Sequence, residues 1–68
     1  MVSKEKREKL DRIANLVRER GELTLEDIMR LFDVGYDTAR KYALEVRVFH
    51  PDILYENGVL YYRPKRGE

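Results

Sequence analysis

Cysteine and tryptophan are absent from this sequence of 68 residues, and histidine occurs once, as His50. The chain therefore forms no disulfide, and a zinc site built from Cys and His is not expected. No apolar run approaches the ~20 residues that a membrane-spanning helix requires, and the charged first residues lack the apolar stretch of a signal peptide. Because this length allows one small domain, we expect a single soluble, cytoplasmic domain without a metal or cofactor.

Net charge is also scarce, since 14 Lys and Arg face 13 Asp and Glu to give +1 at pH 7. The total conceals a pattern along the chain. Residues 1–20 carry a net charge of +3, residues 21–35 carry −3, residues 36–50 carry +1, and residues 51–68 carry none. Two basic segments are thus separated by an acidic one. If the basic segments share one face, they favour DNA as the partner, whereas scattered charges favour a protein.

The spacing of apolar residues predicts a first helix over residues 4–20. One apolar stripe recurs at positions i, i+3, i+4 and i+7, as on the buried face of an amphipathic helix. The stripe consists of Leu10, Ile13, Ala14 and Val17. Ser3 is suited to cap the start of this helix, and Gly21 is suited to the left-handed residue that ends it.

A second, short helix is predicted after Thr24, because residues 24–27 form a Thr-x-x-Asp capping box with its N-cap at Thr24. Its apolar face consists of Leu25, Ile28, Leu31 and Phe32. Residues 22–24 are a candidate for a very short strand. A break at residues 33–35 leads into a third helix over residues 36–48, which ends before Pro51 because the residue preceding a proline disfavours helical backbone. The inward stripe of the third helix consists of Ala39, Tyr42, Ala43 and Val46.

Residues 53–62 carry the strongest local signal, two β-rich runs around Asn57-Gly58. This dipeptide is preferred in two-residue hairpins with a type I′ turn. The implied register pairs Glu56 with Val59, Tyr55 with Leu60, Leu54 with Tyr61, and Ile53 with Tyr62. One face then carries Ile53, Tyr55, Leu60 and Tyr62, and we expect it to be the core side. The predicted fold class is therefore α+β, mainly helical, with a small antiparallel hairpin.

The order helix, tiny strand, helix, tight turn, helix, hairpin resembles the winged helix-turn-helix family. Residues 31–42 carry the resemblance, because they are similar to the family's hydrophobic-x-Gly-Val-Ser-x-x-Thr-Val-Arg-Arg run. The matching positions are Val34, Thr38, Ala39, Arg40 and Lys41. Two positions depart from the run, since Asp33 replaces the usual Gly and Gly35 replaces the usual Ser. The resemblance covers about residues 8–62 and implies three helices and a two-stranded wing at residues 4–62, between tails at 1–3 and 63–68.

The same resemblance implies that the third helix enters the major groove of duplex DNA with its first turns. Arg40 and Lys41 on its outward face then reach guanine or phosphate, and Tyr36 and Thr38 donate to phosphate oxygens. Asp37 either accepts from cytosine or is only a first-turn carboxylate favoured by the helix dipole. Further candidates for DNA contact are Arg47 and, in a basic tail that alternatively serves solubility, Arg63, Lys65 and Arg66.

Apolar residues on the expected outer surfaces indicate a second kind of partner. They are Leu44 and Val48 on the third helix, and Leu54 and Tyr61 on the outer face of the hairpin. These four residues are candidates for the interface of a homodimer, and helix-turn-helix dimers read half-sites ~34 Å apart. The alternative function is a protein-interaction module, or an accessory subunit of a replication, transcription or repair complex. Acidic residues favour this alternative, because Glu26 and Asp27 open the second helix and Glu56 lies at the hairpin tip.

No arrangement of residues typical of catalysis accompanies these features. His50 precedes a proline and has no Cys, Ser/His pair or phosphate-cradling glycine loop beside it. The carboxylates alternate with basic residues at helix-pair spacing, as in Glu5–Lys9 and Glu8–Arg12, which is typical of a solvated face. We therefore expect a binding protein and not an enzyme, with His50 as a capping or partly buried residue.

Overall fold

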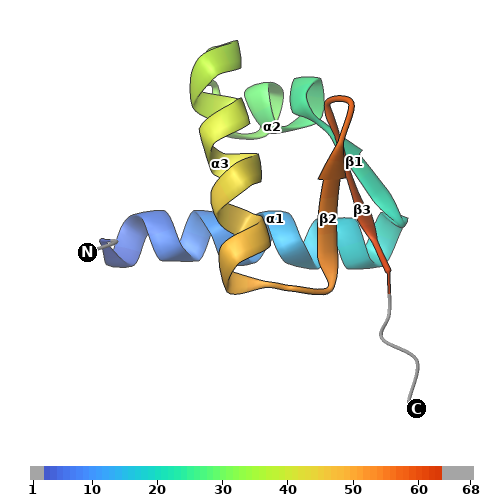
Figure 1. Cartoon of the computed structure of the whole chain (residues 1–68). Helices are drawn as coiled ribbons and strands as arrows, with labels where there is room; N and C mark the ends of the chain where they lie inside the picture. Colours follow the sequence, from blue (N-terminus) through green and yellow to red (C-terminus); the bar gives the residue numbers. More distant parts are fainter. Residues whose placement is uncertain (1–2, 64–68) are drawn as a thin grey trace.

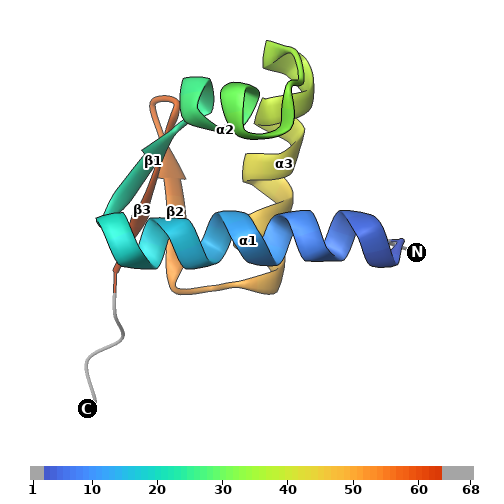
Figure 2. The same cartoon turned by 180° about the vertical axis from the view of Figure 1, so that it is seen from behind.

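The structure is a computed structural model that describes residues 3–63. Its elements are α1 (Lys4–Arg20), β1 (Glu22–Thr24), α2 (Leu25–Phe32), α3 (Tyr36–Phe49), β2 (Ile53–Glu56) and β3 (Val59–Tyr62). Figure 1 shows α3 standing beside the sheet, with α1 running behind both. Figure 2 shows from the other side that the first turns of α1 project beyond α3, and that α1 then crosses α3 and the sheet. The predicted mainly helical α+β class is confirmed, and the arrangement is consistent with a winged-helix-like fold.

Caps at both ends fix the length of α1. The Ser3 hydroxyl accepts a hydrogen bond from the backbone N–H of Lys6 at 3.2 Å. Gly21 ends the helix at φ 90°, and its N–H donates to the Val17 carbonyl at 2.7 Å. A left-handed residue of this kind costs least when it is glycine. The predicted helix over residues 4–20 and both of its caps are confirmed.

The turn between α2 and α3 contains Asp33, which stands where the winged helix-turn-helix run usually has glycine. Asp33 itself takes the left-handed conformation, with φ 55°, that closes α2. Aspartate tolerates this conformation better than most side chains. Gly35 is extended at φ −78° and precedes α3, which continues to Phe49, one residue beyond the predicted end at 48. The sharp turn therefore depends on Asp33 and not on Gly35.

The hairpin predicted as a two-stranded wing is part of a three-stranded antiparallel sheet in the order β1-β3-β2. All four predicted pairs of the hairpin are present. Asn57 and Gly58 have φ values of 53° and 77°, as a type I′ turn requires. The short strand predicted at residues 22–24 is also present, and it pairs with the free edge of β3 so that Leu23 lies opposite Leu60. The wing is therefore joined to the segment that connects α1 and α2.

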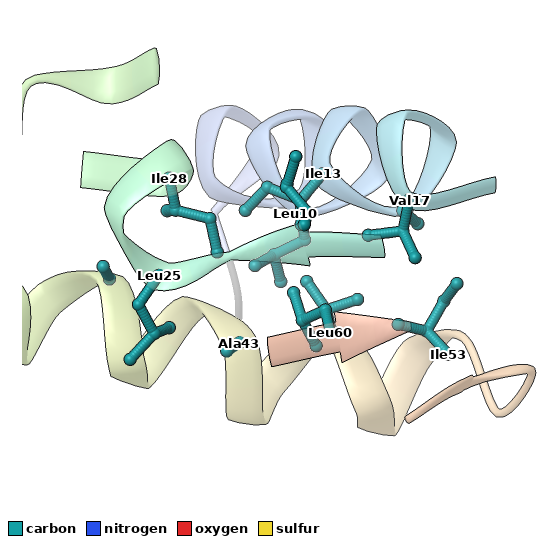
Figure 3. Packing of buried hydrophobic residues seen from close by; sticks show 12 residues of the cluster. Leu10, Ile13, Val17, Leu25, Ile28, Ala43, Ile53 and Leu60 are labelled. Atoms are coloured by element: carbon teal, nitrogen blue, oxygen red, sulfur yellow. The ribbon is translucent and has the colours of Figure 1, made fainter. Parts of the chain in front are cut away.

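One hydrophobic core holds these elements together. Its twelve members, each at most 4% exposed, are Leu10, Ile13, Ala14, Val17, Leu23, Leu25, Ile28, Ala39, Ala43, Val46, Ile53 and Leu60. Figure 3 shows the side chains of α1 facing Leu60 and Ile53 of the sheet. Burial of each large side chain contributes about 1.5–3 kcal/mol. The apolar stripes predicted for α1 and α3 are confirmed, with Tyr42 half-buried against the core.

Tyr62 was predicted on the core side of the hairpin, and the structure corrects this expectation. It shares a sheet face with the buried Leu60, yet its side chain is 37% exposed. The pairing of β1 with β3 stops at Glu22–Tyr61, so Tyr62 lies beyond the end of β1. The Tyr62 N–H donates to the Gly21 carbonyl at 3.1 Å, but Gly21 has no side chain to cover the ring, which is left at the rim of the core. Alternation along a strand predicts the face of a residue but not where the covering elements end.

The capping box at the start of α2 leads to a first prediction about stability. The Thr24 hydroxyl accepts from the Asp27 N–H, and the Thr24 N–H donates to the Asp27 carboxylate, both at 3.1 Å. Thr24→Ala is expected to cost about 1 kcal/mol, because it leaves one N–H of the first turn without its acceptor. For a domain of this size that loss lowers Tm by about 4–8 °C in a thermal melt. Thr24→Ser keeps the hydroxyl and is the matched control, so an equal Tm for the two variants would contradict the assignment.

Candidate nucleic-acid interface

The outward face of α3 is available because the opposite face is committed to the core. Ala39, Ala43 and Val46 are fully buried, and the helix repeats at about 100° per residue. The exposed residues on the outward face are Tyr36, Asp37, Arg40, Lys41, Leu44, Arg47 and Val48, while Thr38 is half-buried. All six candidates for DNA contact on this helix therefore lie at or beside its solvent face, as predicted from its periodicity.

The outward face of α3 has two edges with different neighbours. The edge toward α1 is formed by Thr38, Tyr42, Glu45 and Phe49. Two contacts establish this neighbour, since Lys6 Nζ lies 2.8 Å from Glu45 Oε2 and the Arg7 guanidinium lies 4.6 Å from the centre of the Phe49 ring. The opposite edge carries Arg40 and Arg47. Basic side chains therefore flank the outward face on both sides, from α3 itself on one edge and from α1 on the other.

The hairpin contributes little positive charge at its tip. Glu56 is exposed at the end of β2, and the turn residues Asn57 and Gly58 are uncharged. Arg63 is exposed directly after β3, and its N–H donates to the Asp52 carbonyl at 2.9 Å. Lys65 and Arg66 lie outside the residues that the structure describes. Of the predicted tail contacts, the structure therefore places only Arg63, at the end of the sheet remote from the hairpin tip.

The four apolar candidates for an interface lie on two elements. Val48 and Leu44 are 75% and 39% exposed on α3. Leu54 and Tyr61 lie opposite one another in the sheet and are half-buried. The Tyr61 hydroxyl donates to Glu56 at 3.1 Å, and this bond raises the pKa of the phenol. Val48 is therefore the most exposed apolar side chain of the four.

The basic residues of α1 divide into a group beside α3 and a group remote from it. Lys6 and Lys9 line a groove together with Thr38 and Lys41 of α3. Arg20, by contrast, lines a different groove, between α1 and α2. Among residues 3–63, the expected pairs Glu5–Lys9 and Glu8–Arg12 do not form, and the ion pair within α1 is Arg7–Asp11 at 3.4 Å. Only the first half of α1 thus adds to the basic surface around α3.

A polar network ties α1 to the corner between α3 and β2. Arg18 donates to both carboxylate oxygens of Asp52, from Nε at 2.9 Å and from Nη2 at 3.1 Å. Arg18 Nη2 also lies 3.0 Å from His50 Nδ1, and His50 Nε2 lies 2.9 Å from Asp11 Oδ1. Because a guanidinium only donates, His50 Nδ1 accepts from Arg18 and Nε2 carries the proton that is donated to Asp11. His50 is partly buried in this network, as expected, and it is also the C-cap of α3.

Hydrogen bonds lower the pKa of the carboxylates in this network. The bond from Arg18 holds the pKa of Asp52 below its ordinary value, and the bond from His50 does the same for Asp11. At the start of α2 the backbone N–H of Thr24 lowers the pKa of Asp27. Asp27 is therefore accounted for by helix capping, whereas Glu26 beside it is exposed. The acidic start of α2 combines one structural carboxylate with one that is free to repel a phosphate.

Two groups of residues at this surface were not singled out from the sequence. Lys6 and Lys9 appear in the sequence only as part of a mixed helix face, and their proximity to Lys41 depends on how α1 crosses α3. The Arg18 network joins residues 32 and 34 positions apart, and no local pattern marks them. The single histidine before a proline was the one signal available. Helical periodicity predicts which side of each helix faces outward, but not which outward faces meet.

The fold and this surface define a class of protein: a small, mainly helical α+β domain, consistent with a winged-helix-like fold, with an outward-facing third helix flanked by basic residues. The chain belongs to the family described as "Bacterial protein of unknown function (DUF977)", whose model matches residues 1–65. No curated protein and no solved structure matches the chain significantly. Within residues 3–63, each helix is too short or too polar to span a membrane, and no three His, Asp or Glu side chains gather in a group that could hold a metal ion.

Proposed function

We propose that this protein binds duplex DNA by inserting α3 into the major groove, and that it acts as a small transcriptional regulator. The exposed outward face of α3, with Arg40 and Lys41 one turn from its start, is the observation that supports this proposal. Neither side chain forms an ion pair with any residue from 3 to 63. An α-helix is about 10–12 Å across and fits a major groove about 12 Å wide.

The proposed roles follow from the chemistry of each side chain. Arg40 offers a planar pair of donors that matches the O6 and N7 acceptors of guanine, and Lys41 offers a point charge to guanine or phosphate. Tyr36 is 56% exposed at the first residue of α3, where its hydroxyl can donate to a phosphate oxygen. Asp37 lies in the first turn, where a carboxylate also stabilises the helix through its dipole. Arg47 and Arg63 add phosphate contacts at the periphery.

Salt dependence of duplex binding tests the proposed function. With four to six phosphate contacts, log K is expected to fall with log salt at a slope between about −3.5 and −5.5. The measurement is fluorescence anisotropy of a labelled, random-sequence duplex, titrated with the full chain at several salt concentrations between about 50 and 200 mM. Absence of binding at the lowest salt concentration, or an affinity that does not change with salt, would contradict the proposal.

An RNA duplex of the same sequence is the matched control for insertion of a helix. A-form RNA has a deep, narrow major groove that side chains cannot read, although its phosphate charge is equal. Equal affinity for the two duplexes would indicate charge attraction alone, without insertion of α3. A marked preference for DNA is the expected result.

Exposed apolar side chains on α3 favour a second candidate function, as a protein-interaction module or accessory subunit. Val48 and Leu44 lie on the same outward face as the basic residues, and Val48 is 75% exposed. Such a surface is also compatible with a homodimer. Sedimentation at high micromolar concentration shows whether the chain is a monomer or a dimer. Selection from random duplexes is a second measurement, in which a homodimer that binds DNA is expected to enrich a palindrome. A monomer that binds no duplex would favour a different protein as the partner.

A further inference from the structure

A lysine-lined groove lies between the first turns of α1 and the first half of α3. Its volume is about 390 Å³. Lys6, Lys9 and Glu5 line it from α1, and Thr38, Lys41 and Tyr42 line it from α3. Figure 2 shows the first turns of α1 projecting beyond α3. The groove is therefore formed only when the two helices pack together.

Two of the three lysine ammonium groups in this groove form no ion pair within residues 3–63. Lys6 is engaged by Glu45 at 2.8 Å, but Lys9 and Lys41 form no ion pair with any residue from 3 to 63. Glu5 is the single carboxylate in the lining, against three lysines. The groove consequently carries positive charge that the described part of the chain does not neutralise.

Lys9 is held at the groove by aromatic rings and not by a carboxylate. Its Nζ lies 5.9 Å from the centre of the Phe32 ring and 6.0 Å from that of Tyr42. The two rings meet edge to face, with centres 5.9 Å apart, and join α2 to α3. Contact with aromatic faces attracts the cation and leaves its hydrogen-bond donors available. An ammonium placed in this way can donate to an anion without first breaking an ion pair.

The groove lies on the α1 edge of the outward face of α3. Lys41 stands where that face meets the groove, since it lines the groove and is also exposed. Arg40 and Arg47 lie on the opposite edge. A helix that fills the major groove has one phosphate backbone along each of its two edges. Cations on one edge alone would leave the second backbone without a partner.

We propose that the groove between α1 and α3 binds phosphates of one DNA strand, while Arg47 contacts phosphates of the other strand and Arg40 beside it reaches a base edge. This inference rests on the proposed insertion of α3 into the major groove. Lys9 and Lys41 pair with the phosphate oxygens, and the Thr38 hydroxyl donates to them from the groove wall. The first half of α1 is thereby part of the DNA-binding surface, on the side of α3 away from the hairpin.

The test removes charge from the groove without touching the outward face of α3. Lys9→Gln is expected to make the salt slope of duplex binding shallower by about 0.9, the value for one phosphate contact. Raising the salt from about 50 to 200 mM therefore weakens DNA binding by the variant by a factor about 3.5 times smaller than the factor for the native chain. Lys9→Arg keeps the charge and is expected to keep the native slope. Glu5→Gln removes the one carboxylate of the lining and is expected to tighten binding.

Arg20→Gln is the matched control, because it removes one exposed charge from the far end of the same helix. Circular dichroism establishes that each variant is folded. If Lys9→Gln and Arg20→Gln bind with the native slope and affinity while alanine at Arg40 and Lys41 weakens binding, the groove is not a phosphate site and the α3 interface stands. If the native chain binds no duplex at low salt, the proposed function and this inference fail together.

Discussion

Alanine at both Arg40 and Lys41 is expected to weaken binding of duplex DNA about 100-fold, equal to about 2.8 kcal/mol. A bidentate contact of Arg40 to guanine is worth about 1–3 kcal/mol of discrimination between bases, and Lys41 adds a phosphate contact. These two residues are the exposed cations of α3 nearest its start. Both side chains point away from the core, so the variant is expected to melt within a few degrees of the native chain. Fluorescence anisotropy at fixed salt measures the affinity, and a thermal melt establishes the fold.

Arg20→Ala/Arg30→Ala is the matched control for that measurement. It removes the same net charge from two exposed side chains that line the groove between α1 and α2, to which α3 contributes no residue. If attraction to DNA depends only on net charge, the two double variants will weaken binding equally, and the role assigned to α3 is wrong. If α3 is the recognition helix, the control will stay within about threefold of the native chain, consistent with a screened, remote charge.

Local chemistry in the sequence predicted most of the secondary structure. Asn57-Gly58 specified the turn and with it every pair of the hairpin, because a two-residue loop leaves one register. Thr24 specified the start of α2 in the same way, because its capping box with Asp27 lies within four consecutive residues. Helical periodicity predicted the outward face of α3. These features depend on neighbours within a few positions, which the sequence displays directly.

Contacts between segments far apart in the sequence could not be predicted from these local patterns. The partner of Lys6 is Glu45, 39 positions away, and nothing local distinguishes it from the other carboxylates. The pairing of β1 with β3 depends on how α1 ends above the sheet, and the exposure of Tyr62 depends on where that pairing stops. The candidate site shows the same division, since its α3 half was predicted and its α1 half was not.

Replacement of Arg18 by methionine is expected to lower the free energy of unfolding by about 2 kcal/mol. Arg18 donates to both oxygens of Asp52 and to His50 Nδ1, so its loss removes the side-chain donor that residues 3–63 offer to this carboxylate and this ring nitrogen. Hydrogen bonds to charged groups contribute about 1.5–3 kcal/mol. The Arg18 and Asp52 side chains are 33% and 27% exposed, which lets water replace part of the interaction. Methionine retains most of the apolar stem, so the variant isolates the guanidinium.

Thermal unfolding measures this effect as a fall in Tm of about 10 °C. Arg12→Met is the control, because Arg12 is exposed on the same helix and forms no ion pair with residues 3–63. A double-mutant cycle with Asp52→Ala separates the pair from the rest of the network. Additive losses in the two single variants would mean that the Arg18 guanidinium stabilises the fold through its other partners, His50 and Asn15, and not through Asp52.

Acid titration of the same variant separates the ion pair from packing by a different route. The pKa of Asp52 is lowered in the folded state, chiefly by the hydrogen bond from Arg18. A carboxylate with a lowered pKa stabilises the fold fully above its unfolded value and loses that contribution as the pH falls through its folded value. The native chain is therefore expected to lose stability as the pH falls below about 4, and Arg18→Met to lose less. The difference in unfolding free energy between the two proteins is then expected to narrow toward low pH. A difference that stays constant from neutral to acid pH would show that the Arg18–Asp52 pair does not hold α1 to the corner between α3 and β2.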